Sequence, residues 1–279
     1  MAGPIVVGVD GSECARAAVE WAVADARRRR LPLKAVHVCE RTSRGFDTRK
    51  YCLGVLEAAA DSARAVGADV EVSTELAEGN VVDVLIRQSA SADSLVLGGR
   101  GSGGFAELVL GSVGLAVAGH AGGPVVIVRG PAAEEYGRIV VGEDGSESAR
   151  EAMAYAVEQA RARHAQLLVV HACRESVVSA YAPDYGLMLE DAFQEEARRA
   201  RERMSLWRAK NPDVEIVEQQ AREHPVPALT NASATADLVV VGSRGLGGFA
   251  SAVLGSVSHG VLHHATCPVA VVRPRAERP

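Results

Sequence analysis

This chain of 279 residues has few lysines, no net positive charge and no Cys-x-x-Cys pair. Each of these features argues against a class of protein. The three lysines are Lys34, Lys50 and Lys210, and none precedes Ser or Thr, so the Gly-x4-Gly-Lys-(Ser/Thr) loop of P-loop NTPases is absent. A net charge of −5 gives the chain no overall basic field, which argues against nucleic acid and anionic membranes as partners.

Cysteines are few and scattered: Cys14, Cys39, Cys52, Cys173 and Cys267. Their number is odd and no Cys-x-x-Cys pair occurs, which argues against a zinc site or a disulfide framework and favours a reducing compartment. No run of roughly 18 apolar residues occurs, and the N-terminus lacks a basic-then-apolar signal pattern. We therefore expect a cytoplasmic protein without a membrane span.

The chain repeats itself, which predicts two similar domains. Residues 6–13 recur as residues 140–147, an offset of 134. Residues 98–129 align without gaps with residues 242–273, an offset of 144, and 19 of those 32 positions are identical. We expect one repeat over residues 1–130, a linker over 131–137 and a second repeat over 138–279.

Short runs of Val, Ile and Leu alternate with longer Ala-rich segments in both repeats. Such continuous apolar runs predict strands buried on both faces, and hence an α/β fold with a doubly wound parallel sheet covered by helices. Ligands of such sheets bind beyond the carboxyl ends of the strands, where the strand order reverses. The expected strands are Ile5–Val9, Leu33–Val38, Val70–Thr74, Ser94–Leu97 and Val125–Val128, then Ile139–Val141, Leu167–His171, Val214–Val217, Leu238–Val241 and Val269–Val272.

The first strand of each repeat ends in Asp-Gly-Ser, at residues 10–12 and 144–146. A carboxylate at this edge could accept hydrogen bonds from a ligand. Equally, Asp or Ser could cap the next helix while the glycine makes the turn. The residues alone leave both interpretations open.

A denser glycine pattern follows the fourth strand of each repeat. Gly98-Gly99-Arg100-Gly101 leads to Gly111-Ser112, and residues 242–245 lead in the same way to residues 255–256. Glycines permit close approach of a phosphate chain to main-chain amides. Because the second glycine pair opens an apolar helical segment, the helix N-terminus would favour an anion there. The pattern therefore predicts nucleotide binding in both repeats.

The spacing resembles that of the universal stress protein family, in its ATP-binding branch, which carries Gly-x2-Gly-x9-Gly-(Ser/Thr) after its fourth strand. The Val-Gly-x-Asp-Gly-Ser opening and the closing His-Ala-x-x-Pro-Val, from His120 and from His264, are also similar to the family. The resemblance covers both repeats. It implies a tandem universal stress protein with two five-stranded parallel sheets of adenine nucleotide α-hydrolase-like, flavodoxin-like layering and strand order 3-2-1-4-5.

The resemblance also implies the ligand, ATP, with Mg²⁺ as an optional companion, and its contacts. In the first repeat these are Gly8, Asp10, Val38, Gly98, Arg100, Gly101, Gly111, Ser112 and Val113. In the second repeat they are Gly142, Asp144, Gly242, Arg244, Gly245, Gly255, Ser256, Val257 and Ser258. Because Gly114 stands where the second repeat has Ser258, we expect the first repeat to hold phosphates less firmly.

Three functions remain open from the residues. The first is a nucleotide-binding regulator of the stress response. The second is a slow ATPase or ATP-dependent transferase, for which Arg100 and Arg244 could supply charge. The third is a structural pseudo-dimer without a ligand. A nicotinamide enzyme is disfavoured because the glycine cluster does not follow the first strand.

Two further expectations concern metal ions and partners. His259 and His263 are four residues apart and could share a helix face, but no glutamate base or cysteine pair accompanies them, so we expect no metal site. The fifth strands, Val125–Val128 and Val269–Val272, are Val-rich edges that invite pairing. We expect them to pair within one chain as a pseudo-dimer, and homodimers of the whole chain are a further prediction.

Overall fold

The computed structural model describes residues 3–39, 45–101, 110–130, 135–172, 183–246 and 254–274. Within these residues each repeat has five strands and four helices in alternation. The first repeat contains β1 (Ile5–Gly8), α1 (Glu13–Arg29), β2 (Leu33–Cys39), α2 (Gly45–Val66), β3 (Val72–Glu78), α3 (Val81–Ser89), β4 (Ser94–Gly98), α4 (Ser112–His120) and β5 (Val125–Val128). The second contains β6 (Arg138–Gly142), α5 (Glu147–Arg163), β7 (Gln166–Ala172), α6 (Pro183–Lys210), β8 (Ile216–Ala221), α7 (Pro225–Ser233), β9 (Leu238–Gly242), α8 (Ser256–His264) and β10 (Val269–Val272).

The strands form one ten-stranded sheet in the order β3-β2-β1-β4-β5-β10-β9-β6-β7-β8. Each half has the predicted order 3-2-1-4-5, and its neighbouring strands are parallel. The halves meet where β5 pairs antiparallel with β10, with Val126 opposite Ala270. The two five-stranded sheets that the sequence predicts are therefore joined into one through their fifth strands, the strands expected to pair within the chain.

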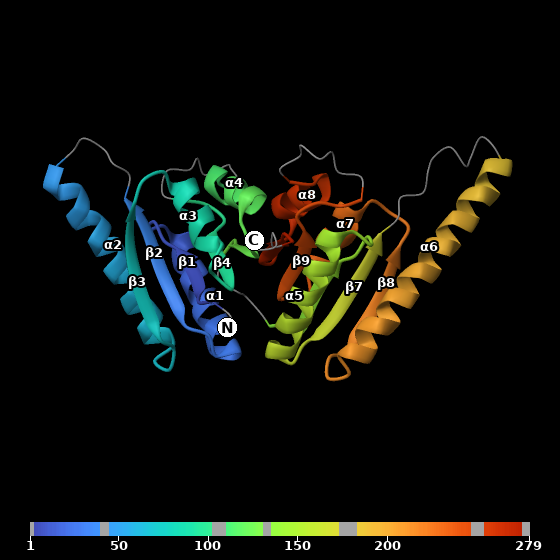
Figure 1. Cartoon of the computed structure of the whole chain (residues 1–279), viewed down its shortest axis with the longest axis horizontal. Coiled ribbons are helices and arrows are strands. Elements are labelled where there is room, and N and C mark those ends of the chain that lie inside the picture. The colour runs from blue at the N-terminus through green and yellow to red at the C-terminus, as the bar shows by residue number, and fades with distance from the viewer. Residues whose placement is uncertain are drawn as a thin grey trace, which may run out of the picture.

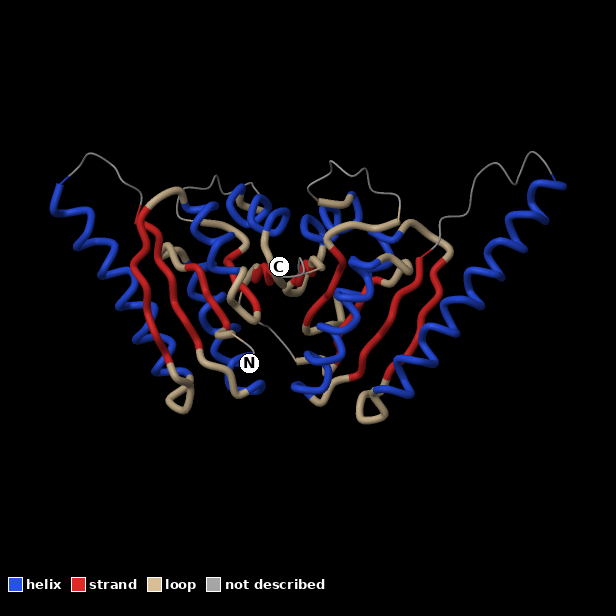
Figure 2. The backbone as a smooth tube through the Cα atoms, viewed as in Figure 1, coloured by secondary structure: helices blue, strands red, loops and turns tan. Residues whose placement is uncertain are grey.

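Helices cover both faces of the sheet and leave an apolar core on each (Figure 1). Successive strand residues point to opposite faces, so Val7 packs in the core beneath α1 and α5, and its neighbour Val6 packs in the core beneath α3 and α7. The long helices α2 and α6 lie at the two outer ends, and α4 and α8 lie near the centre (Figure 1). Figure 2 shows the same arrangement of strands and helices on either side of that centre.

A buried polar cluster joins α1 to α5 where the repeats meet. Asp25 is completely buried, and its carboxylate accepts hydrogen bonds from Arg163 at 2.9 Å and from Gln159 at 3.2 Å. Arg29 lies 3.5 Å from the same carboxylate. The offset of 134 makes Gln159 the counterpart of Asp25, and Arg163 the counterpart of Arg29. The cluster is thus built from equivalent positions of two repeats that differ in one charge.

In the described part of the chain, no helix combines the length and the apolar character needed to cross a bilayer.

Candidate functional site

The predicted site residues collect at the carboxyl ends of β1 and β4 and of their counterparts β6 and β9. From β1 the chain runs outward to β2 and β3, then returns to β4 on the other side of β1. The connections leaving β1 and β4 therefore diverge to opposite faces of the sheet. This divergence opens a crevice at the edge where doubly wound sheets bind ligands.

In the Asp-Gly-Ser turns the serine caps the next helix and the glycine makes the turn. Gly11 and Gly145 have φ of 83° and 82°, a conformation that favours glycine. Ser12 caps α1 by accepting a hydrogen bond from the amide of Ala15 at 3.1 Å, and Ser146 caps α5 in the same way. The aspartate caps no helix and is left to face the neighbouring loop.

Asp144 fastens the first loop of the second repeat to the glycine loop after the fourth strand, and Asp10 lies against the equivalent loop of the first repeat. In the second repeat, one carboxylate oxygen of Asp144 accepts from the amide of Ser146 at 3.0 Å, and the other accepts from the amide of Leu246 at 3.2 Å. A Cβ added to Gly245 would lie 2.5 Å from that second oxygen, and one added to Gly101 would lie 2.8 Å from the Asp10 carboxylate. Any larger residue at these two positions would displace the aspartate carboxylate.

The N-termini of α4 and α8 are open toward the same crevice. Gly111 and Gly255 are the N-cap residues, and neither helix has a side-chain hydrogen bond at its cap. The first amides of a helix have no partner within it, and the helix dipole makes this end attractive to anions. The amide of Gly255 is held by the carbonyl of Ser243 at 2.7 Å, as Gly111 is held by Gly99 at 2.8 Å. The two glycine turns of each repeat are therefore tied together around an uncapped helix end.

In the second repeat these elements enclose a cavity of about 300 Å³. Its lining brings together every predicted residue of that repeat: Gly142, Asp144, Gly242, Arg244, Gly245, Gly255, Ser256, Val257 and Ser258. The lining also includes residues that the sequence did not single out, namely Glu143, Ala149, Val170, Ala172, Pro225, Leu229, Val241 and Leu246. Of these, Ala172 could have been found, because the offset of 134 makes it the counterpart of Val38.

The first repeat places its predicted residues in the same way, as far as it is described. Gly8 and Gly98 end β1 and β4, and Val38 is half-buried next to the end of β2. Arg100 and Gly101 are exposed in the loop after β4, and the carbonyl of Arg100 accepts a hydrogen bond from Ser12 at 3.4 Å. Ser112 and Val113 are exposed in the first turn of α4. Residues 102–109, between the two glycine turns, lie outside the described residues.

Ser258 supports the second cavity through the main chain. Its side chain is almost completely buried, and its hydroxyl lies 3.2 Å from the carbonyl oxygen of Ser243 and 2.9 Å from that of Gly255. The hydroxyl donor is therefore used inside the loop. Gly114 of the first repeat has no hydroxyl for this contact, so the two loops are braced differently.

A charged cluster beside the second cavity has no counterpart among the described residues of the first repeat. Glu143 occupies the position of Val9, and its carboxylate lies 3.0 Å from Nδ1 of His171 and 3.1 Å from Nη2 of Arg203. Burial would raise the pKa of Glu143, but the hydrogen bonds from His171 and Arg203 outweigh it and hold that pKa below its ordinary value. In the first repeat, His37 instead lies 2.7 Å from the carbonyl oxygen of Val9.

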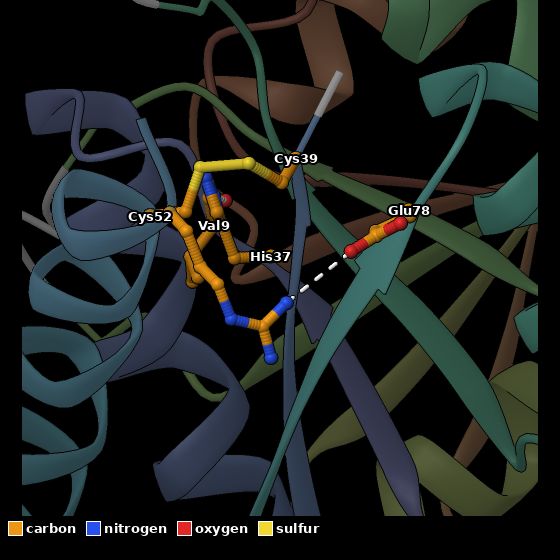
Figure 3. Close-up of a disulfide and its surroundings, with 6 residues drawn as sticks. Val9, His37, Cys39, Cys52 and Glu78 are labelled. Carbon is orange, nitrogen blue, oxygen red and sulfur yellow. Dashed lines mark hydrogen bonds and ion pairs between the residues drawn. A yellow bond between two sulfur atoms is a disulfide. The ribbon is translucent and has the colours of Figure 1, made fainter. Parts of the chain in front are cut away.

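The cysteine count argued against a disulfide framework, but the structure contains one disulfide. Cys39, at the end of β2, forms a disulfide with Cys52 on α2 (Figure 3). No pattern in the sequence indicates this pair, because 13 residues separate the two cysteines and only the fold brings the strand end and the helix together. Among the described residues, Cys14 and Cys267 are free.

The histidines of α8 show no ligand set for a metal ion. The rings of His259 and His263 lie 4.6 Å apart between centroids, as their spacing predicted. Within the described ranges, no group of three or more His, Cys, Asp or Glu side chains could hold a metal ion.

Comparison with known proteins agrees with this geometry. The model of the universal stress protein family matches residues 1–129 and again residues 135–273. The chain belongs to the universal stress protein family. A universal stress protein of Mycolicibacterium smegmatis is 35% identical over 97% of each chain. One from Mycobacterium tuberculosis is 35% identical over 96% of each.

A solved structure supports the fold of this universal stress protein across both repeats. The crystal structure of a universal stress protein from Archaeoglobus fulgidus superposes with a TM-score of 0.72. It covers 97% of this chain and 98% of its own, with 21% sequence identity. The tandem architecture is therefore shared over the whole length.

Proposed function

We propose that the chain binds one ATP in each repeat and acts as a nucleotide-dependent regulator of the stress response. The observation that carries the proposal is the pair of glycine turns tied around an uncapped helix N-terminus at the divergence point of each half-sheet. Main-chain amides and a helix dipole at such a position favour phosphate groups. The spacing of these glycines also matches the motif of the ATP-binding branch of the family.

The cavity of the second repeat suits the two ends of a nucleotide. Val170, Ala172 and Leu229 give one end an apolar lining suitable for a base. The glycine turn and Ser256 at the start of α8 form the other end, which suits phosphates. Asp144 lies between them, where it could contact the ribose or order a Mg²⁺ ion.

The described carboxylates favour binding over turnover. ATP hydrolysis requires a base or positioned water and a charge clamp. Glu143 is already engaged by His171 and Arg203, and Asp144 accepts hydrogen bonds from two amides. We therefore propose at most slow ATPase activity, which phosphate release from the purified chain would measure.

Equilibrium dialysis of the full chain with ATP tests the proposal. Gly111→Val and Gly255→Val would each cover one helix N-terminus with a branched side chain. Both residues have negative φ of −75° and −69°, which valine can adopt, and a Cβ on Gly255 would lie 3.3 Å from the carbonyl oxygen of Ser243. We expect two bound ATP per wild-type chain, one in each single variant and none in the double variant.

Gly54→Val is the matched control for these glycine variants. Gly54 lies on α2, and no atom would contact its added Cβ within 4 Å. This variant should bind two ATP. Unchanged ATP binding in the folded double variant of Gly111 and Gly255 would refute the assignment of both pockets.

The pairing of the repeats supports a proposal about assembly. We propose that the chain functions in the cytoplasm as an intrachain pseudo-dimer, with β5 and β10 as the shared seam. A homodimer of whole chains is a further proposal. Light scattering that gives the mass of a single chain, 29.2 kDa, at all concentrations would refute the homodimer alone.

A further inference from the structure

The disulfide between Cys39 and Cys52 fastens α2 to the edge of the sheet that carries the first proposed pocket. Cys39 directly follows Val38 at the end of β2, and Cys52 lies on α2 with only 4% of its surface exposed. Their Cα atoms are 6.1 Å apart, within the range of about 4.4–6.8 Å that disulfides require. Figure 3 shows the bridge close to His37 and Val9, and Val9 directly precedes the Asp-Gly-Ser turn in the sequence.

The segment of α2 around Cys52 lies against that turn. A Cβ added to Gly11 would lie 3.4 Å from Cγ2 of Val55 and 3.9 Å from the hydroxyl of Tyr51. Cys52 lies between these two residues on the helix. The bridge therefore fixes the part of α2 that contacts the loop holding Asp10.

The second repeat fastens its long helix by charge instead. Arg203 of α6 lies against the equivalent turn, because a Cβ on Gly145 would be 3.4 Å from its Cζ. The same arginine pairs with Glu143 at 3.1 Å. Helix α6 contains no cysteine, although Cys173 is the counterpart of Cys39. Thiol chemistry can therefore act on α2 and not on α6.

We propose that Cys39 and Cys52 are a reversible oxidation site, closed by a peroxide and opened by a dithiol, which raises the ATP affinity of the first pocket alone. The affinity part rests on the proposed function. In the closing reaction the Cys39 thiol is oxidised by hydrogen peroxide to a sulfenic acid, and one water is released. The Cys52 thiol then attacks that sulfur and displaces the second water, which leaves the disulfide. A dithiol reductant reverses the step by exchange and becomes a cyclic disulfide.

The order of attack follows from exposure. Cys39 is half-buried and Cys52 is buried, so the peroxide reaches Cys39 first and Cys52 resolves the intermediate. Closure fixes α2 against the Asp10 turn before ATP arrives, so less ordering remains for binding to perform. The oxidised first pocket therefore binds more tightly than the reduced one.

Peptide mapping of the full chain tests the covalent site without any nucleotide. Cleavage after Lys and Arg places Cys39 in the peptide of residues 35–41 and Cys52 in the peptide of residues 51–64. After peroxide treatment and alkylation of free thiols, mass spectrometry should find these peptides linked, and dithiothreitol should separate them. Separate alkylation of both cysteines after peroxide would overturn the proposal.

ATP titration in the two redox states tests the coupling. The Gly255→Val variant reports the first pocket and the Gly111→Val variant reports the second. Oxidation should raise the ATP affinity of the Gly255→Val variant about five-fold or more and leave the ATP affinity of the Gly111→Val variant unchanged. Adding Cys52→Ala should abolish this response, whereas Cys173→Ser, at the counterpart of Cys39, should preserve it.

Two outcomes would overturn the coupling: one refutes only the coupling, and the other also refutes the proposed function. Equal ATP affinities in the oxidised and reduced Gly255→Val variant would show that the bridge does not act on the pocket. ATP binding by neither variant in either redox state would refute the proposed function and the coupling with it. Peptide mapping would still decide whether the disulfide forms.

Discussion

At the scale of single residues, an aspartate carboxylate lies against a glycine between the two loops of each proposed pocket. A methyl group at Gly245 would lie 2.5 Å from the Asp144 carboxylate, and one of the two must move. We expect Gly245→Ala to weaken ATP binding in the second repeat about ten-fold, roughly the loss of one hydrogen-bonded contact. Isothermal titration in a Gly111→Val background measures this pocket alone.

The control for that substitution is Gly54→Ala on α2, where a Cβ meets no atom within 4 Å. It should leave ATP binding unchanged and stabilise the helix by about 0.5–1 kcal/mol. Equal ATP affinities for Gly245→Ala and Gly54→Ala would contradict the role of Asp144.

Glu143 makes the stability of the second repeat depend on pH. Its folded pKa lies below the ordinary value of 4.5, so the stability it contributes is present above that value and is lost as pH falls through the folded pKa. We expect Glu143→Gln to lower the urea midpoint near neutral pH. The difference in urea midpoint between wild type and Glu143→Gln should become smaller as the pH falls below 4.5. A gap that stays constant or widens in acid would show that the carboxylate charge is not the cause.

Single residues were only partly predictable from the sequence. The glycines and aspartates stand out in the sequence because each occurs twice at fixed spacing. Glu143 was missed because its counterpart in the first repeat is the uncharged Val9, so a comparison of the repeats does not single it out. The pairing of Cys39 with Cys52 was missed because it depends on where α2 lies, which local pattern does not determine.

At the scale of elements, the helix caps at the start of α1 and α5 are a test of the local structure. Ser12 and Ser146 each accept a hydrogen bond from an amide three residues later at 3.1 Å. We expect Ser12→Ala and Ser146→Ala each to lower the free energy of unfolding by about 1 kcal/mol. Urea denaturation followed by circular dichroism measures this loss.

Aspartate provides the matched control for the cap, since it accepts the same hydrogen bond and favours a helix N-terminus. Ser12→Asp and Ser146→Asp should therefore remain close to wild type. Alanine and aspartate variants of equal stability would contradict the assigned caps.

Strands were predicted best where they are buried on both faces. The predicted bounds of the fifth strands agree with β5 and β10, and the fourth strands each extend one residue further, to Gly98 and Gly242. The outer strands β3 and β8 begin later and run on to Glu78 and Ala221. Their continuation follows the hydrogen-bond ladder of the neighbouring strand, where Cys39 pairs with Glu78. Apolar runs do not report such pairing, because outer strands carry exposed polar residues.

At the scale of the whole molecule, the buried contact between α1 and α5 joins unlike repeats. Asp25 is completely buried between Arg163, whose side chain is 8% exposed, and Arg29. We expect Asp25→Asn to lower the free energy of unfolding by about 3–5 kcal/mol, because it leaves the buried arginines without their shared carboxylate. Guanidinium denaturation of the full chain measures the effect.

An exposed ion pair of α5, the helix that carries Arg163, is the control for that measurement. Arg161 pairs with Asp213 at the surface, where both side chains are about half exposed. Arg161→Ala should cost less than about 1 kcal/mol. A loss for Asp25→Asn no larger than that for Arg161→Ala would contradict the importance of the buried cluster.

The tandem organisation and the strand order were predictable because the repeat and its motifs are strong signals. The contact between α1 and α5 was not, since Asp25 and Gln159 lie in Ala-rich helices whose pattern reports only burial. The pairing of β5 with β10 was expected from their Val-rich edges, but their antiparallel register was not, because valine-rich edge strands permit several registers.

The central claim is that uncapped helix ends and glycine turns hold a triphosphate in each repeat. A crystal structure of the full chain grown with a non-hydrolysable ATP analogue tests it most directly. We expect phosphate oxygens within hydrogen-bond distance of the first amides of α4 and α8, and the base near Val38 and Ala172. Analogue bound elsewhere, with both helix ends closed by the chain itself, would contradict the claim.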